Sequence, residues 1–256
     1  MEAGMNQLNQ SLDATIVDLR DAHAASSVVL VCEHASPYIP ARFNNLGLAA
    51  DASRSHVVWD PGALALAQGM AQHLRATLIS ARTSRLVYDC NRPPDAPDAM
   101  PARSEVVEVP GNAGLTAAQK ADRIATYYHP FRAAIAQVLK RFDAPILITV
   151  HSFTPVYDGA AREVEIGVLH DRDTRLADAL LSTADTAHVV RRNAPYGPDD
   201  GVTHTLKEHA LPGGHLNVML EVRNDLIADA HAQSEMAATL SSWVSRALSR
   251  LSVATC

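Results

Sequence analysis

The chain has 256 residues, 47% of them hydrophobic and 20% charged, which is enough to form one large core. We therefore take residues 1–256 as a single catalytic domain. The formal net charge of -6 argues against a nucleic-acid partner, because such binding depends on Lys and Arg neutralising phosphates, and we expect small solutes instead.

The start of the chain and its cysteines bear on the compartment. Residues 1–13 lack the basic cluster and apolar stretch of a signal sequence, and we expect them to form a flexible N-terminal extension. No apolar run approaches the roughly 20 residues that span a bilayer. Cys32, Cys90 and Cys256 are too few and too far apart for a disulfide framework or a four-cysteine zinc site. We expect a cytoplasmic protein with no membrane partner, as a monomer or small homo-oligomer.

Short apolar runs alternate with amphipathic stretches along the chain. The runs predict strands over Ser27–Cys32, around Leu86–Tyr88, and over Pro145–Val150, Val164–Leu169 and Asn217–Val222. The amphipathic stretches predict helices over Pro61–Ala76, Thr116–Phe142, Asp173–Ala184 and Gln233–Leu251. Most of the runs are continuously apolar, as in parallel strands that are buried on both faces. The pattern predicts an α/β fold, a three-layer α/β/α sandwich with a mostly parallel central sheet.

Prolines and glycines mark the boundaries of these elements. Asp60 followed by Pro61 predicts an N-cap at the start of the first helix. Pro130 predicts a kink or a division within the second helical stretch. Two stretches rich in proline or glycine, 92–116 and 191–214, predict long irregular loops, and the first has the length of a functional lid.

Chemically reactive side chains lie at the ends of three predicted strands. Glu33 and His34 follow the first, His151 follows the third, and Glu221 lies near the end of the last. The carboxyl ends of parallel strands meet at one sheet edge, where open α/β folds bind ligands. Asp60, at a helix start, would face the same edge. Two imidazoles and a carboxylate are a donor set for catalytic zinc, and a further carboxylate could take a proton from water.

Each of these side chains also has a structural alternative. His34 and His151 could cap their strands and bond a backbone carbonyl, and Asp60 could serve only as an N-cap. Glu221 in an apolar strand needs a partner, because buried carboxylates are costly without one, and Arg223 could be that partner.

Other polar residues have open roles. His170 also follows an apolar run and is an alternative metal ligand, whereas His129 and His204 fit substrate-side or structural roles. Glu33 could orient His34 through a hydrogen bond, as metal-bound histidines commonly require, or it could form a salt bridge elsewhere.

Five strings, in the same order along the chain, resemble the N-formylglutamate amidohydrolase family. They are VCEHAS at 31–36, VWDPGA at 58–63, SRLVYDCNRPP at 84–94, TVHSF at 149–153 and LEVRNDL at 220–226. The resemblance extends over most of the chain. It implies a phosphorylase/hydrolase-like fold, similar to that of the zinc carboxypeptidases, with a mixed sheet between helices.

The resemblance also implies an activity and a metal site. It implies one Zn²⁺ ion held by His34, Asp60 and His151, with Glu221 as the general base. The implied reaction is hydrolysis of the amide bond of a small N-acyl acidic amino acid, first of all N-formyl-L-glutamate to formate and L-glutamate, as in histidine degradation. The family's formylglutamate hydrolases begin the first motif with Pro-His and a small residue, whereas this chain has the string CEHAS at 32–36, so the acyl group and the amino acid stay open.

Two other functions are compatible with the same residues. One is a zinc peptidase or peptidoglycan-type amidase acting on a larger substrate, and the other is a non-catalytic relative that binds a metal or metabolite. The same donor set can also hold iron, cobalt or manganese.

Arginines are the candidate ligands for an anionic substrate. Asn91 and Arg92 resemble the Asn-Arg pair with which aspartoacylases and carboxypeptidases grip a substrate carboxylate. A planar guanidinium can bind a carboxylate through two parallel bonds. N-formylglutamate has two carboxylates, so a second cation is needed, and Arg85 and Arg223 are the candidates, with Arg82 a weaker one.

Overall fold

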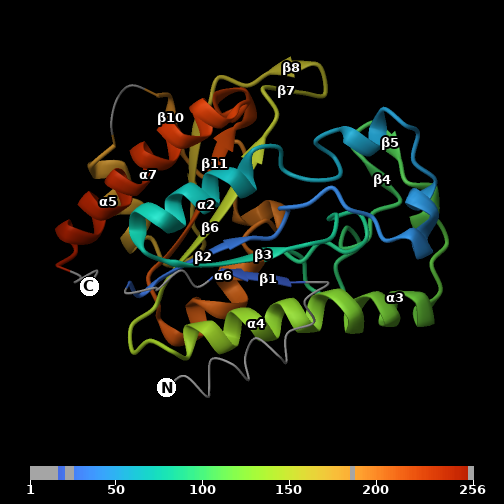
Figure 1. The fold of residues 1–256 in the computed structure, drawn as a ribbon, viewed down its shortest axis with the longest axis horizontal. Coiled ribbons are helices and arrows are strands. Elements are labelled where there is room, and N and C mark those ends of the chain that lie inside the picture. The colour runs from blue at the N-terminus through green and yellow to red at the C-terminus, as the bar shows by residue number, and fades with distance from the viewer. Residues whose placement is uncertain (1–16, 21–25, 185–187, 253–256) are drawn as a thin grey trace.

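The computed structural model describes residues 17–20, 26–184 and 188–252. Within these ranges, a mixed sheet of seven strands has helices on both faces (Figure 1), which confirms the predicted three-layer α/β/α architecture. The expected flexible extension over residues 1–13 lies outside the described residues. That the whole chain is a single catalytic domain stays a prediction.

The central sheet has the strand order β1-β3-β2-β6-β11-β9-β10. Its strands are β1 (Val17–Arg20), β2 (Val28–Cys32), β3 (Thr77–Ala81), β6 (Ile146–Phe153), β9 (Ile166–Leu169), β10 (Val190–Arg192) and β11 (Asn217–Arg223). The four central strands β3, β2, β6 and β11 run parallel, and β9 is antiparallel to β11. Two small hairpins lie outside this sheet, β4 (Arg103–Ser104) with β5 (Val107–Glu108) and β7 (Val156–Tyr157) with β8 (Ala160–Ala161).

Helices cover the sheet on both sides. One face is covered by α2 (Ala63–Leu74), α5 (Arg175–Ser182) and α7 (Ala230–Arg250), and the other by α4 (His129–Leu139) and α6 (His204–His209), with α3 (Ala117–Arg123) preceding α4 (Figure 1). Short 3-10 turns occur at Ala41–Gly47, Ala52–Arg54, Pro110–Asn112, Pro198–Asp200, Leu211–Gly213 and Asn224–Ile227. Among the described residues, no helix combines the length and the apolar character needed to cross a membrane.

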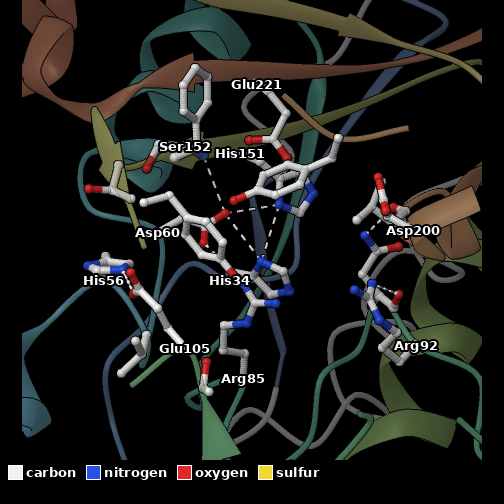
Figure 2. Close-up of a pocket in the computed structure, with 18 residues that line it drawn as sticks. His34, His56, Asp60, Arg85, Arg92, Glu105, His151, Ser152, Asp200 and Glu221 are labelled. Carbon is white, nitrogen blue, oxygen red and sulfur yellow. Dashed lines mark hydrogen bonds and ion pairs between the residues drawn. The ribbon is translucent and has the colours of Figure 1, made fainter. Parts of the chain in front are cut away.

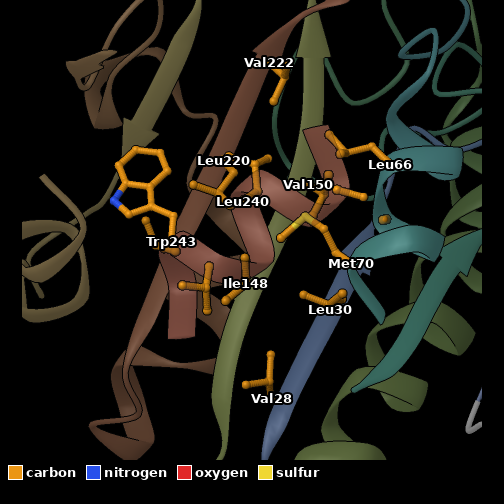
Figure 3. Packing of buried hydrophobic residues seen from close by; sticks show 14 of the residues in the cluster. Val28, Leu30, Leu66, Met70, Ile148, Val150, Leu220, Val222, Leu240 and Trp243 are labelled. Atoms are coloured by element: carbon orange, nitrogen blue, oxygen red, sulfur yellow. The ribbon is translucent and has the colours of Figure 1, made fainter. Parts of the chain in front are cut away.

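Alternate residues of the central strands build the core beneath α2 and α7 (Figure 3). The strand residues are Val28, Leu30, Ile148, Val150, Leu220 and Val222, and the helix residues shown with them are Leu66, Met70, Leu240 and Trp243. The intervening strand residues Leu147 and Met219 belong to the core on the opposite face. Because side chains alternate along a strand, His151 and Glu221 project toward that opposite face, where α6 packs on β6 and β11.

Two predictions about individual elements were wrong. Residues 85–87 form a turn and Tyr88 lies outside any strand, and the strand next to β2 is instead β3, a short apolar run that follows α2. Asp60 does not cap the first helix, because α2 begins after Gly62, whose φ of 81° is left-handed, and no side chain caps it. The Asp60 carboxylate is thereby left for another role.

The helical stretch is not divided at Pro130, because the backbone stays helical from α3 into α4. The chain passes from α3 through a π-helical segment, Ile124–Tyr128, into α4, and Pro130 lies in the first turn of α4. The π-helical segment interrupts the regular i→i−4 hydrogen-bond pattern just before Pro130, where the proline has no N–H to contribute.

Candidate metal centre

Side chains from separate parts of the chain meet at the carboxyl edge of the four parallel strands (Figure 2). His34 follows β2, His151 lies in β6, and Glu221 lies in β11. The register between β6 and β11 pairs Glu221 with His151, so the carboxylate and the imidazole are neighbours on one face of the sheet. Strand order therefore brings together the groups that the sequence predicted would converge.

Asp60 is brought to the same point by backbone contacts of its loop. Its N–H donates to the carbonyl of His34 at 2.9 Å, and its Oδ2 accepts a hydrogen bond from the N–H of Ser152 at 3.3 Å. Only two residues later, Gly62 turns the chain into α2, and a Cβ at this glycine would lie 2.7 Å from the carbonyl oxygen of Ile227. The turn thus needs glycine both for its φ and for space.

Three donor atoms form a compact, buried triangle. Asp60 Oδ2 lies 3.2 Å from His34 Nδ1 and 3.0 Å from His151 Nδ1, and the two nitrogens are 3.3 Å apart. A tetrahedral zinc ion with bonds of about 2.0–2.1 Å separates its ligands by about 3.3 Å. The three groups, each buried, could therefore hold a metal ion.

Each histidine of the triangle has a buried carboxylate at its other ring nitrogen. His34 Nε2 lies 2.8 Å from Asp89 Oδ1, and His151 Nε2 lies 3.0 Å from Glu33 Oε2. The second contact is an ion pair rather than a well-aligned hydrogen bond. Such carboxylates orient the rings of metal-bound histidines and raise their basicity.

The sequence singled out one of these carboxylates. Glu33 was left open between a hydrogen bond to His34 and a salt bridge elsewhere, and in the structure it forms an ion pair with His151. Asp89, which contacts His34, was missed, although it stands two residues before Asn91 in one of the five strings.

The electrostatics of the metal-free centre favour histidine protonation. Burial alone would lower the pKa of His34 and His151, but the neighbouring carboxylates raise both above the usual value, His151 by more. Burial would raise the pKa of Asp60 and Asp89, yet the histidines hold both below the usual value. The two imidazoles and two aspartates thus stabilise each other's charged forms.

Metal affinity is therefore expected to rise with pH. A protonated imidazole nitrogen cannot donate to a metal, so binding must release about two protons, and affinity should fall by up to about 100-fold per pH unit below both pKa values. Competition titrations of the metal-free protein with zinc at pH 6, 7 and 8 measure this. An affinity that did not change over this range would contradict the assignment of His34 and His151 as ligands.

Glu221 stands beside the triangle with an unsatisfied carboxylate. It is 5% exposed, and among the described residues its Oε2 has no hydrogen-bond partner. Burial raises the pKa of Glu221 to about 7, opposed by His151 and reinforced by Asp60. A buried polar atom without a partner is rare and commonly functional, and a carboxylate that titrates near neutral pH suits a general base.

The comparisons with known proteins show the family of the chain. Residues 26–228 match the model of the N-formylglutamate amidohydrolase family. The chain belongs to this family of hydrolases. The resemblance predicted from the five strings is thereby confirmed.

Two solved structures are similar to this family member. A gene product from Agrobacterium tumefaciens is 50% identical with a TM-score of 0.92, and the match covers 93% of this chain and 97% of that chain. The N-formylglutamate amidohydrolase from Ralstonia eutropha is 19% identical with a TM-score of 0.67, and the match covers 91% and 99%. The second likeness shows a shared fold. No curated protein matches the chain.

A cavity of about 320 Å³ opens onto the triangle, a volume suited to a small ligand. Besides the four residues of the centre, its walls include Arg85, Asn91 and Arg92. Arg85 Nη2 lies 2.9 Å from Asp89 Oδ2, and its Nη1 lies 3.6 Å from Asp60 Oδ1. Arg85 is thus the cation nearest the predicted metal ligands among the described residues.

Arg92 is buried and partly engaged within the protein. Its Nε donates to Asp98 at 2.6 Å, and its Nη1 donates to the carbonyls of Asn91 and Gly201. Among the described residues no hydrogen bond reaches its Nη2. This leaves one amino group that could meet a ligand in the cavity.

Arg223 and Arg82 do not line the cavity among the residues that the structure describes. The guanidinium of Arg223 contacts Asp225 at 2.8 Å and Glu165 at 3.3 Å. The prediction that Arg223 binds substrate therefore finds no support in its position, because acidic neighbours outside the cavity hold its side chain.

The three other histidines that the sequence singled out, His129, His170 and His204, are not part of the triangle. His170 follows β9, which runs antiparallel to β11, so it lies toward the opposite edge of the sheet from Glu221. His204 accepts or donates a 2.9 Å hydrogen bond with the Tyr128 hydroxyl, and His129 begins α4.

Residues on two loops were missed by the sequence analysis. Glu105 lies at the turn between β4 and β5, within the predicted lid loop, and its carboxylate contacts His56 at 2.7 Å and the N–H of Asp158 at 3.3 Å. Tyr196 lines the cavity and accepts a 2.9 Å hydrogen bond from Arg162. Glu105 follows the two-residue strand β4, which the sequence did not predict, and Tyr196 lies four residues after β10, so the predicted strand ends could not have identified them.

Proposed function

We propose that the chain is a metal-dependent amidohydrolase that cleaves the amide bond of a small N-acyl amino acid, with N-formyl-L-glutamate as the leading substrate. The observation that carries this proposal is the 3.0–3.3 Å triangle of His34, Asp60 and His151 beside the unpartnered carboxylate oxygen of Glu221. Family membership supports the reaction class. Formate and L-glutamate are the expected products, which would fit a step in histidine degradation.

Zinc is the ion we propose for the triangle. Two imidazole nitrogens and a carboxylate oxygen match catalytic zinc sites, which keep a fourth position open. When bound, such an ion would polarise the acyl oxygen and lower the pKa of a water molecule.

The chain's own residues supply the remaining steps. We assign to Glu221 the removal of a proton from the attacking water and its delivery to the nitrogen of the departing amine. Asp89 and Glu33 hold the two imidazoles in place from behind. The burial of all these groups strengthens their electrostatic interactions.

Recognition of the substrate carboxylates falls to the arginines of the cavity. We assign one carboxylate to Arg92, whose Nη2 makes no hydrogen bond among the described residues, together with Asn91, whose amide nitrogen has one proton beyond the one donated to the Val202 carbonyl. Arg85 is the remaining candidate for the second carboxylate. The small cavity supports a small anionic substrate over a peptide or cell-wall polymer.

A metal-removal experiment with a substrate panel tests the proposal. We expect protein dialysed against a chelator to lose hydrolysis of N-formyl-L-glutamate and to regain it with zinc. The panel should contain N-formyl, N-acetyl and N-carbamoyl forms of glutamate and aspartate, each scored by release of the free amino acid. Activity that survives chelation would refute the metal-dependent mechanism. Zinc binding without turnover of any panel member would favour a non-catalytic relative.

A further inference from the structure

A chain of buried contacts leads away from His34 on the side opposite the metal triangle. Asp89 Oδ1 lies 2.8 Å from His34 Nε2 and accepts a 2.9 Å hydrogen bond from the backbone N–H of Asn91. The side-chain oxygen of Asn91 then accepts from the backbone N–H of Thr205 at 3.0 Å. Thr205 belongs to α6, so this helix reaches the support of His34.

The same threonine also reaches the support of the other histidine. Thr205 Oγ1 donates to Glu33 Oε1 at 2.5 Å, and Glu33 Oε2 lies 3.0 Å from His151 Nε2. The hydroxyl has one proton, and the charged Glu33 oxygen is closer than Asn91 Oδ1, which is 3.1 Å away. With the metal triangle, these contacts close a ring in which Thr205 is the link between the two carboxylates.

Glu33 is held by two side chains, His151 on one carboxylate oxygen and the Thr205 hydroxyl on the other. The carboxylate is 1% exposed, and among the described residues its well-aligned hydrogen bond comes from Thr205. Without that donor, a buried charged oxygen would lose its hydrogen bond, which is costly, and the carboxylate would be free to turn away from His151.

We propose that Thr205 is a positioning residue of the metal centre, whose hydroxyl fixes Glu33 and thereby aims His151 Nδ1 at the metal. This inference rests on the proposed metal-dependent function. Residues behind the ligands of a metal site commonly control affinity by about 10- to 100-fold, although they do not touch the metal. Thr205 is 2% exposed and does not line the cavity, so its position favours a role through Glu33 over direct contact with substrate.

Zinc affinity of the full chain provides the test. We expect Thr205→Val, which keeps the shape of the side chain but removes the hydroxyl, to weaken zinc binding by about 10- to 100-fold. Thr205→Ser, which keeps the hydroxyl, should restore most of the affinity. The measurement is titration of metal-free protein with zinc against a chromophoric chelator, at a pH where wild-type binding is tight.

Thr203→Val is the matched control. Thr203 is fully buried two residues earlier in the same segment, and its hydroxyl donates to Asp171 rather than to the ring. The control should lose some thermal stability while keeping wild-type zinc affinity. If both valine variants weakened zinc binding equally, the effect would be general loosening and the inference would be overturned.

A second variant protects the test against misfolding of Thr205→Val. Glu33→Gln would present an amide N–H to His151 Nε2, so the ring proton would move to Nδ1, the nitrogen that faces the metal. We expect this variant to weaken zinc binding at least as much as Thr205→Val. A wild-type zinc affinity in Thr205→Val would overturn the inference but not the proposed function. If Thr205→Val does not fold, a wild-type zinc affinity in Glu33→Gln would do the same. A wild-type protein that bound no zinc would overturn the proposed function as well.

Discussion

Replacing Glu221 with glutamine is expected to lower kcat by about 100- to 10,000-fold, the usual contribution of a general acid or base. Glutamine keeps the size of the side chain but cannot accept the proton of the attacking water. Because Glu221 is not a member of the metal triangle, zinc affinity should stay close to that of the wild type. Steady-state kinetics with N-formyl-L-glutamate and a zinc titration of the same preparation measure the two quantities.

Glu165→Gln is the matched control for this substitution. Glu165 lies just before β9 outside the cavity, where its carboxylate contacts Arg223 at 3.3 Å. Its change to glutamine should leave kcat unaltered. A Glu221→Gln variant with wild-type kcat would remove Glu221 from the mechanism, and a variant that had lost zinc would show that Glu221 acts as a ligand instead.

Strand-end position identified the members of the centre that lie on the sheet. His34, His151 and Glu221 could be found because continuous apolar runs predicted buried parallel strands, and parallel strands bring their carboxyl ends to one edge. Asp60 was harder, since an aspartate before a proline reads equally as a helix cap. The structure excludes the capping role of Asp60, because Gly62 is the residue that immediately precedes the helix.

Contacts between distant segments set the limit of the sequence analysis. Glu33 was open to more than one partner and Asp89 was not singled out, and only the folded chain places Glu33 against His151 and Asp89 against His34. Arg223 stands two residues after Glu221, yet Asp225 and Glu165 hold its guanidinium away from the cavity. Arg85 and Arg92 are also paired with aspartates, but they line the cavity and Arg223 does not. Whether a cation of a motif faces the cavity depends on its tertiary neighbours.

The second prediction concerns the contribution of Asp60 to stabilisation of the protein by zinc. Zinc at about 1,000 times its Kd should stabilise the folded protein by about 4 kcal/mol, because it binds the native state in preference to the unfolded chain. We expect Asp60→Asn to abolish most of this gain. The substitution removes the anionic ligand, and it also removes the charge that lies against both imidazoles.

Urea unfolding of wild type and Asp60→Asn, each with and without zinc, measures this effect as a double difference. Any loss of stability in the metal-free variant then cancels, and only the contribution of zinc remains. Asp171→Asn is the control, since Asp171 is also a buried aspartate but contacts Thr203 and Lys207 away from the triangle. Its zinc-dependent gain should equal that of the wild type. If Asp60→Asn retained the full gain, Asp60 would be no ligand, and zinc would have to bind through the two histidines and another group.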